Sequence, residues 1–560
     1  MATVSNAEVA NVLLALAQLL STQKENPFKV RAYRRAAKAI ANTAESVEEI
    51  VRTGGNLTAI PGVGTGIAGA VREIVERGGL RQLEELRAKA GEQTASLSDY
   101  PMLDPKRVER IYRKLRISTI DELKATLEAG DIGRQMGARM EHHVRQALTP
   151  AAEVLLYEAD RMVPAIEQFL TGPCGAARAR AAGDYRRRVE VIRELTFVVE
   201  TADFEAVVEA FRRYGGRIAL TRAGDGSAEF QHPSGMRIRL CGTGERHWGL
   251  MLAAATGSER HLAKLAEAGH DLTALARGRA SFRTEVAVYR KLGLEPIPPE
   301  LREGHDEVEQ AAEWRLPALV TVEDIRGELH AHSTTSDGGA TIEQMAEAAR
   351  ERGYEYLGIT DHSQSLKIAR GVPEERLWEQ IRYIDHLNER GKLGVRVLKS
   401  AEVDIRADGS LDYSDAVLAE LDYTICSVHS RFGLNRVEQT ERIMRAMDNR
   451  YFRILGHATG RLLLRRPGYE LDFGRIVEHA RARGCFFEIN SSPDRLDVSA
   501  ENARIAAAAG VKIAINTDAH STGELEFVAY GVDQARRAGL EKEQVLNCLP
   551  GAELLRTLRR

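Results

Sequence analysis

The stretch GELHAHS, residues 327–333, is a short apolar run that ends on two histidines. Six further runs follow it at intervals of roughly thirty to forty residues, which is the length of one strand-plus-helix unit. They are YLGITDHS (356–363), RVLKSAEVDI (396–405), YTICSVHS (423–430), RILGHAT (453–459), CFFEINSS (485–492) and KIAINTDAHS (512–521). Each run precedes sequence typical of a helix, and such regular alternation predicts a parallel sheet or barrel.

Nearly every one of these runs ends on a histidine or an acidic residue. In a closed (β/α) barrel the carboxyl ends of the strands meet at one mouth, so we expect these side chains to share one cavity. A single histidine at a strand end is more often a hydrogen-bonded structural residue, but seven such ends together make that alternative a poor one. The candidate positions are His330, His332, Asp361, His362, Glu402, His429, His457, Glu488, Asp518 and His520.

Neutral imidazoles and carboxylates together suit Zn²⁺, Mn²⁺ or Fe²⁺, and the candidates outnumber the ligands of a single ion. A site with two or three divalent ions is therefore expected. Such a site lowers the pKa of a bound water and stabilises both the attacking and the leaving oxygen of a phosphoryl displacement.

The motifs HAHSTTSDG, GITDHS, AEVDI, SVHSRF, GHATGRL, EINSSPDRLD and NTDAHS resemble those of the polymerase and histidinol phosphatase (PHP) domain, in the version found at the C-terminus of bacterial family X DNA polymerases. The resemblance covers residues 324–560 and implies a phosphoesterase that removes nucleotides from DNA 3′ ends, with manganese or zinc. It also implies that Glu402 bridges two ions, and that Arg431 and Arg461 position the phosphate unless they are ordinary surface charges. The implied metal ligands are His330, His332, Asp337, His362, Glu402, His429, His457, Asp518 and His520.

The N-terminal part is similar to the DNA-binding region of the same family. LTAIPGVGTGIAGAVREIVERG (57–78) has the form of a helix-hairpin-helix, whose turn Gly62-Val63-Gly64 directs backbone N–H groups at a DNA phosphate. The basic segment NPFKVRAYRRAAKAI (26–40) precedes it and favours DNA binding over an ordinary glycine turn, with Arg31, Arg34 and Arg35 as candidate contacts. A second copy at 99–115 has Met102-Leu103-Asp104 where glycines are expected, which predicts weak or no DNA binding there.

The polymerase motif itself departs from the family pattern. The resemblance to family X polymerases implies a GSxRR turn, then a strand with Asp-x-Asp, and then a third Asp on a neighbouring strand. In that family the three carboxylates hold two Mg²⁺ ions. In GDYRRRVEVIRELTFVVE (183–200) and GMRIRLCG (235–242) the three positions hold Glu194, Thr196 and Arg239. One carboxylate of three remains, and an arginine repels the cations that the reaction needs. We therefore expect a catalytically inactive polymerase core.

Length and composition agree with a multidomain soluble protein. The 560 residues include 43% hydrophobic and 28% charged residues, with a net charge of −3 and five scattered cysteines, which favours a reducing compartment. The expected fold is a helical helix-hairpin-helix region, an α+β nucleotidyltransferase-like palm and thumb, and a C-terminal α/β barrel of the (β/α)7 type. The expected domains are residues 1–90 (first hairpin), 91–150 (fingers-like), 151–245 (palm-like), 246–300 (thumb-like), 301–323 (linker) and 324–560 (PHP).

Three functions are compatible with these features. The favoured one is a metal-dependent 3′–5′ exonuclease or 3′-end processing enzyme, with abasic-site endonuclease activity also described for the family, whose polymerase core serves DNA binding. The alternatives are an active gap-filling polymerase with a proofreading domain, and a small-molecule phosphatase of the histidinol phosphate type. The expected partner is gapped, nicked or 3′-ended DNA bound without sequence preference, by a cytoplasmic, nucleoid-associated monomer that contacts no membrane.

Overall fold

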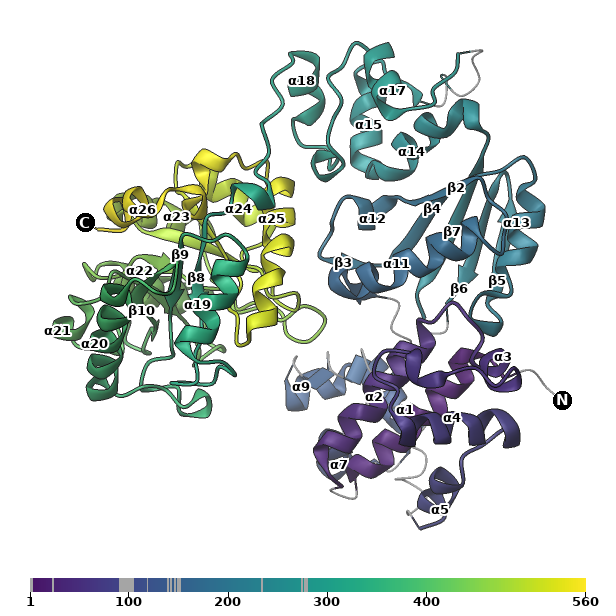
Figure 1. Ribbon diagram of the computed structural model, residues 1–560, viewed down its shortest axis with the longest axis horizontal. Coiled ribbons are helices and arrows are strands. Elements are labelled where there is room, and N and C mark those ends of the chain that lie inside the picture. Colours follow the sequence, from purple (N-terminus) through teal and green to yellow (C-terminus); the bar gives the residue numbers. More distant parts are fainter. Residues whose placement is uncertain are drawn as a thin grey trace. The chain divides into compact units, whose positions relative to one another are not determined.

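The computed structural model describes residues 4–559 except 23–24, 90–104, 118, 138–139, 142–143, 146–147, 149–152, 233–234, 273–274 and 276–279. The chain folds into two compact units (Figure 1). One comprises Met1–Arg186 and Val191–Pro296, and the other comprises Arg187–Glu190 and Ile297–Arg560. No helix in the described part of the chain is long and apolar enough to cross a membrane.

The first unit begins with helices that share one apolar core. The core is built mainly on α1, whose leucines at positions 13, 16, 19 and 20 are buried, and on α2, which packs along it. A second helical group has its own small core around Ile111, Leu123 and Ile132. The first group is α1 (Asn6–Thr22), α2 (Pro27–Ala41), α3 (Val47–Arg52), α4 (Thr65–Arg77) and α5 (Arg81–Lys89), and the second is α7 (Pro105–Leu115), α8 (Ile120–Glu128) and α9 (Asp131–Met136). The turn Met102–Leu103–Asp104 of the second predicted hairpin lies outside the described residues.

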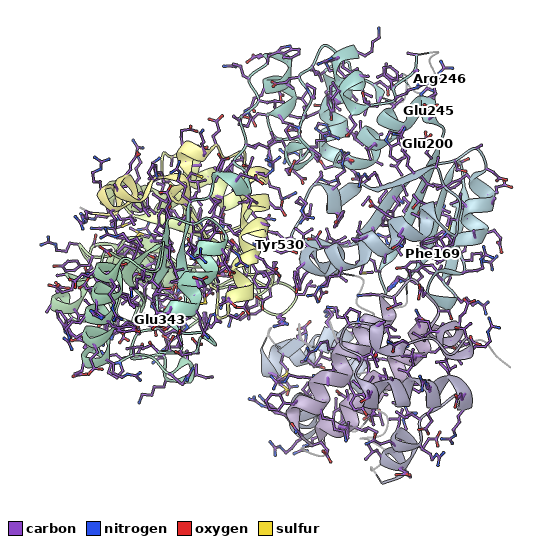
Figure 2. The ribbon with its side chains drawn as sticks, in the orientation of Figure 1. Phe169, Glu200, Glu245, Arg246, Glu343 and Tyr530 are labelled. Carbon is purple, nitrogen blue, oxygen red and sulfur yellow. The ribbon has the colours of Figure 1, made fainter. Side chains whose placement is uncertain are left out.

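A mixed five-stranded sheet forms the middle of the first unit, in the order β2-β4-β7-β6-β5. Its strands are β2 (Arg178–Ala181), β4 (Glu194–Glu200), β5 (Ala219–Gly224), β6 (Ser227–Gln231) and β7 (Arg237–Thr243), and β1 (Val154–Leu155) pairs separately with β3 (Val191–Ile192). Phe169, which is labelled in Figure 2, lies on α11 (Leu156–Thr171). Its ring meets those of Phe211 and Tyr214 edge-on, with ring centroids 6.0 and 5.2 Å away. The helices around this sheet are α11 (Leu156–Thr171), α12 (Gly183–Arg186), α13 (Phe204–Phe211), α14 (Trp248–Thr256), α15 (Glu259–Glu267) and α17 (Glu285–Lys291).

The second unit contains a parallel sheet of seven strands in the order β14-β13-β12-β11-β10-β9-β8. The seven predicted strands are all present, as β8 (Gly327–Ala331), β9 (Tyr356–Ile359), β10 (Arg396–Asp404), β11 (Tyr423–Ser427), β12 (Ile454–Leu455), β13 (Phe486–Asn490) and β14 (Ile513–Asn516). The sheet curves until its two edges meet, where Ala331 bridges Ala519 and the N–H of His332 donates to the carbonyl of Ala519 at 2.8 Å. The predicted barrel is therefore confirmed.

Helices between the strands cover the outside of the barrel, and their apolar sides are buried against it. A helix between two consecutive strands returns the chain to the start of the next strand, so the polar strand ends collect at one mouth, whereas the last two helices follow β14. The helices are α19 (Ile342–Glu351), α20 (Glu374–Arg390), α21 (Asp415–Leu418), α22 (Arg436–Met447), α23 (Phe473–Arg483), α24 (Ala500–Ala508), α25 (Val528–Arg537) and α26 (Gly551–Leu558).

The segment expected as a linker packs as part of the second unit. It holds α18 (Glu307–Ala312), whose Val308 and Ala311 are buried. Just before it, Glu300 accepts from Nε of Arg536 on α25 at 2.8 Å. The prolines and charges that predicted a linker instead belong to a layer that lies against the barrel.

Gly358 on β9 makes room for a hydrogen bond inside the barrel. The hydroxyl of Tyr423 on β11 donates to the carbonyl of Leu329 at 2.6 Å, and a Cβ on Gly358 would lie 1.7 Å from that hydroxyl. We expect Gly358→Ala to lower the free energy of unfolding by about 1–3 kcal/mol, the usual cost of overpacking a core. Removal of the hydroxyl in a Tyr423→Phe background should reduce this cost.

Scanning calorimetry of the four proteins of this double-mutant cycle measures the effect. Gly523→Ala is the control, because a Cβ on Gly523 has no neighbour within 4 Å, and its transition should match that of the wild type. Equal losses for Gly358→Ala in both backgrounds would contradict the steric explanation.

Candidate metal centre

Three groups of potential metal ligands lie side by side at the mouth of the barrel. Within each group the candidate ligand atoms are within 4.8 Å of one another. The structure thus brings together, from strand ends far apart in sequence, eight of the nine residues that the sequence singles out as ligands. The groups are His332, Asp337, His362 and His520; His330, His332 and Asp518; and His362, Glu402 and His429.

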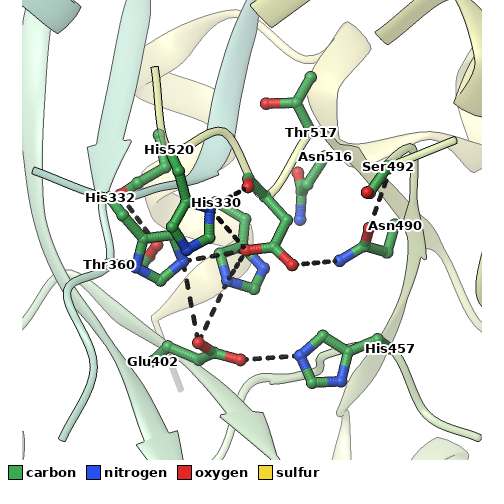
Figure 3. A network of polar contacts seen from close by, with 12 residues as sticks. His330, His332, Thr360, Glu402, His457, Asn490, Ser492, Asn516, Thr517 and His520 are labelled. Atoms are coloured by element: carbon green, nitrogen blue, oxygen red, sulfur yellow. Dashed lines mark hydrogen bonds and ion pairs between the residues drawn. The ribbon is translucent and has the colours of Figure 1, made fainter. Parts of the chain in front are cut away.

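Glu402, at the end of β10, lies between these groups, and its two carboxylate oxygens face different imidazoles (Figure 3). Oε1 lies 2.9 Å from Nε2 of His457, the ninth residue, and 3.3 Å from Nε2 of His429. Oε2 lies 2.7 Å from Nδ1 of His362 and 3.6 Å from Nε2 of His330. A carboxylate with ligands on both sides has the arrangement needed to bridge two cations.

Several buried polar atoms of this cluster make no hydrogen bond within the described chain. They include Nε2 of His330, Nδ1 of His332 and Oε2 of Glu402, and the three side chains have no exposed surface. Such atoms cost free energy unless a partner satisfies them. Divalent cations would satisfy them, so the donor set fits a metal centre of the kind on which PHP domains depend.

The carboxylates of the cluster favour their charged form. Burial raises the pKa of Glu402, but the nearby charges of His429, His362 and His330 outweigh burial and hold that pKa well below its usual range. Burial likewise lowers the pKa of His429, yet Glu402 and Asp404 raise it to about 10. The opposite charges hold one another in place, and a cation that displaced the protons would meet ionised carboxylates.

Glu488, at the end of β13, orients two of the candidate ligands without joining the metal groups. Its carboxylate is fully buried and lies 2.7 Å from Nδ1 of His330. It also accepts from the N–H of His457 at 2.8 Å and from Nδ2 of Asn516 at 2.9 Å. Because the bond at Nδ1 fixes the imidazole of His330, Nε2 of that ring is the atom left to face the cluster. The sequence places Glu488 at the mouth but does not reveal this orienting contact.

Two aspartates have comparable supporting positions. Asp404 lies 2.5 Å from Nδ1 of His429, so Nε2 of that ring also faces Glu402. Asp361, one of the strand-end candidates, instead accepts from the hydroxyls of Ser333 and Ser336 at 2.6 and 2.5 Å. It therefore holds the loop that carries Asp337. The motif AEVDI contains the signal for Asp404, because residues two apart on a strand share a face.

The arginines near the mouth differ in availability. Arg431 follows β11 in a left-handed conformation with φ of 56° and is exposed. Arg461 is mostly buried, and its guanidinium donates to the carbonyl of Arg495 at 2.9 Å and to that of Leu496. Nε of Arg495 lies 3.7 Å from a carboxylate oxygen of Asp518. Arg495, which sequence reasoning missed although it lies within EINSSPDRLD, is thus the arginine with a measured approach to a candidate ligand.

The first hairpin and the basic helix α2 lie together in the first unit. Gly62 has φ of 85°, and a Cβ there would lie 3.2 Å from the side-chain carbons of Arg35. Gly64 is the N-cap of α4 and provides no side-chain cap. Arg31 stacks over the ring of Phe28 at 4.6 Å, and Arg34, also exposed, donates to Gln18 at 3.3 Å. Arg35 therefore lies beside the turn, and Arg31 and Arg34 are exposed on the same helix.

The degenerate polymerase positions form an ion-pair cluster on the middle sheet. β4 and β7 pair in parallel with Thr196 opposite Arg239. Nε of Arg239 lies 3.2 Å from Glu194, and its Nη2 lies 3.2 Å from Glu229 on β6. Arg237 approaches Glu194 to 3.8 Å. The remaining carboxylate is thus neutralised by arginines of the neighbouring strand.

Two domain families match the chain. A helix-hairpin-helix domain matches residues 4–80, and a PHP domain matches residues 328–492. Probable phosphatases from Syntrophotalea carbinolica and a Thermoanaerobacter species are 28% and 31% identical to this chain over 232 residues. These alignments cover 39% of this chain and 90% and 88% of the two relatives.

A further relative matches along almost the whole chain. The DNA polymerase/3′-5′ exonuclease PolX of Bacillus subtilis is 32% identical over 560 residues, which cover 96% of this chain and 97% of the relative. The order of the matched domains is the order expected from the sequence. The chain therefore belongs to the bacterial family X DNA polymerases that carry a C-terminal PHP domain.

Proposed function

We propose that this protein is a metal-dependent phosphoesterase that removes nucleotides from DNA 3′ ends, and that its polymerase core binds DNA without extending it. The observation that carries the proposal is the pair of imidazole sets on the two oxygens of Glu402. Two or three Mn²⁺, Zn²⁺ or Fe²⁺ ions held by the nine candidate ligands would supply an ionised water and stabilise the leaving oxygen. Abasic-site cleavage would use the same centre.

The residues of the chain have separate tasks in this proposal. Glu402 would help to hold the ions, while Glu488 and Asp404 keep the rings of His330 and His429 directed inward. Arg431 and Arg495 offer guanidinium groups to the phosphate near the mouth. Arg461 acts indirectly, because its bond to the carbonyl of Arg495 holds that backbone in place.

The inactive polymerase core is supported by the ion pairs of the middle sheet. A pair of Mg²⁺ ions needs several carboxylates, but of the three family positions only Glu194 has one, and Arg239 lies 3.2 Å from it. The basic surface around Arg35 and the turn at Gly62 remains suited to phosphate contacts. The core would then retain DNA binding and lose nucleotidyl transfer.

A time course on a 5′-labelled gapped DNA with Mn²⁺, with and without dNTPs, tests this function. We expect the labelled strand to shorten in both conditions. His330→Ala combined with His332→Ala should lower the rate by more than about a hundredfold, because it removes two ligands at once. A labelled strand that lengthens with dNTPs would instead favour the active polymerase, and hydrolysis of histidinol phosphate without DNA cleavage would favour the small-molecule phosphatase.

Substitution Glu488→Gln tests the orienting role. A neutral amide can donate to Nδ1 of His330 and reverse the ring's tautomer, so we expect metal affinity to fall about 10- to 100-fold. Titration of the metal-free protein with Mn²⁺ by calorimetry measures it directly. Glu478→Gln, on the exposed side of α23, is the matched control. Unchanged affinity in Glu488→Gln would rule out the contribution of this contact.

Substitution Arg35→Gln tests the DNA-binding surface. We expect several-fold weaker binding that does not depend on sequence, and a salt dependence whose slope falls by about 0.9 for one lost phosphate contact. Fluorescence anisotropy without divalent ions measures binding in the absence of cleavage. Arg52→Gln, an exposed arginine on α3, should bind like the wild type. Equal slopes for both variants would argue against the proposed surface.

A further inference from the structure

The loop of residues 363–372 projects from the mouth of the barrel directly beside a candidate ligand. It follows His362, and it closes where the N–H of Val372 donates back to the carbonyl of His362 at 2.8 Å. The hydroxyl of Tyr413 donates to the carbonyl of Val372 at 2.6 Å and fixes the returning strand. Both ends of the loop are therefore anchored at the metal centre.

Side chains from the end of β10 and from the loop after it hold the 363–372 loop in its conformation. Ser365 donates from its hydroxyl to Asp404 at 2.6 Å and from its N–H to Asp412 at 2.7 Å. A Cβ on Gly371 would lie 2.1 Å from the carbonyl oxygen of Ser363, so the two arms of the loop approach as closely as backbone allows. Because Asp404 also orients His429, the loop and the centre share one hydrogen-bond network.

The tip of this loop presents an apolar side chain outward. It is a single 3₁₀ turn, Lys367–Ala369, in which Ala369 is buried and Ile368 is 94% exposed. Among the large apolar side chains that the structure describes as exposed, that of Ile368 has the highest exposed fraction. Single apolar residues on a surface are common. The position of this one, on an anchored loop at the mouth, is what distinguishes it.

Two cations flank the exposed isoleucine. Lys367 and Arg370 are both exposed, and neither has an ion-pair partner within 4.0 Å in the described part of the chain. Arg370 has φ of 56°, which turns the chain sharply after the tip. In the strand order β9-β10-β11, the 363–372 loop follows β9, and the exposed Arg431 follows β11. Positive charge thus lies on both sides of the loop that follows β10.

An aliphatic side chain between two cations matches the chemistry of a DNA end. Lysine and arginine contact phosphates, whereas inserted aliphatic side chains separate stacked bases. Five of the nine candidate ligands are buried and the other four are only partly exposed, so a paired terminal nucleotide must leave its partner before its phosphate can reach them. A rigid apolar tip beside the mouth can take the place of the lost base contacts.

We propose that the 363–372 loop is a strand-separating wedge for duplex 3′ ends. Ile368 packs against the terminal base pair as it opens, and Lys367 and Arg370 hold the flanking phosphates. The wedge rests on the proposed function, since it requires DNA as the substrate. It adds a specific class of substrate, the paired 3′ end, to that function.

Cleavage by Ile368→Ala on matched substrates tests the wedge. The substrates are a single-stranded 3′ end, a blunt duplex of the same sequence, and the p-nitrophenyl ester of thymidine 5′-monophosphate. We expect the rate on the duplex to fall about fivefold or more, while the rates on the single strand and on the ester stay within about twofold of the wild type. Ile368→Leu should restore the duplex rate, and Ile505→Ala, an exposed isoleucine on α24, should match the wild type.

The outcomes separate the wedge from the function beneath it. If Ile368→Ala leaves the ratio of duplex to single-strand rates unchanged while the wild type cleaves DNA, the wedge is overturned and the nuclease stands. An equal fall on all three substrates would also overturn it, because the substitution would then act on the centre itself. A wild type that hydrolyses the ester but no DNA would overturn the DNA-directed function together with the wedge.

Discussion

The buried charge of Glu402 is the constraint on which the mouth of the barrel depends. A carboxylate without exposure is costly unless positive charge surrounds it, and here imidazoles from four other strand ends approach its two oxygens. Those imidazoles need partners on their outer nitrogens, which Glu488 supplies to His330 and Asp404 supplies to His429. The carboxyl ends of the six strands from β8 to β13 are thus linked through one charged network, which leaves little freedom for any of these strands to shift.

The sequence predicted the barrel because two signals coincide in each βα unit. A short apolar run marks a strand buried on both faces, and a polar residue at its end marks the mouth. The same two signals do not tell which of two neighbouring residues, such as Asp361 and His362, faces the cluster of candidate ligands. Adjacent strand residues point to opposite sides, so one of the two faces the cluster and the other supports the loop at Ser333. Which one does so depends on where the strand ends, and that boundary is set by packing.

The sequence did not predict the contacts between distant segments, for a related reason. The aligned motifs place Thr196 and Arg239 on neighbouring strands, and the structure pairs β4 with β7 so that these two residues are opposite each other. The second partner of Arg239, Glu229, comes from β6, whose position in the sheet no local pattern indicates. Likewise, the contact between Arg35 and Gly62 joins two helical segments through their packing on α1. Local patterns predict elements, whereas the choice among possible neighbours is made by the whole core.

The polymerase positions on the middle sheet and the candidate metal centre of the barrel differ in how their charges are balanced. On the middle sheet, the guanidinium of Arg239 lies between Glu194 and Glu229 and balances the charge of both carboxylates. In the barrel, Nε2 of His330 and Nδ1 of His332 are buried and make no hydrogen bond with the described residues. Removing ions there would leave unsatisfied groups in the interior, which costs far more than at a partly exposed sheet. The proposed loss of metals from the polymerase core and their proposed retention in the barrel therefore rest on the same physical argument.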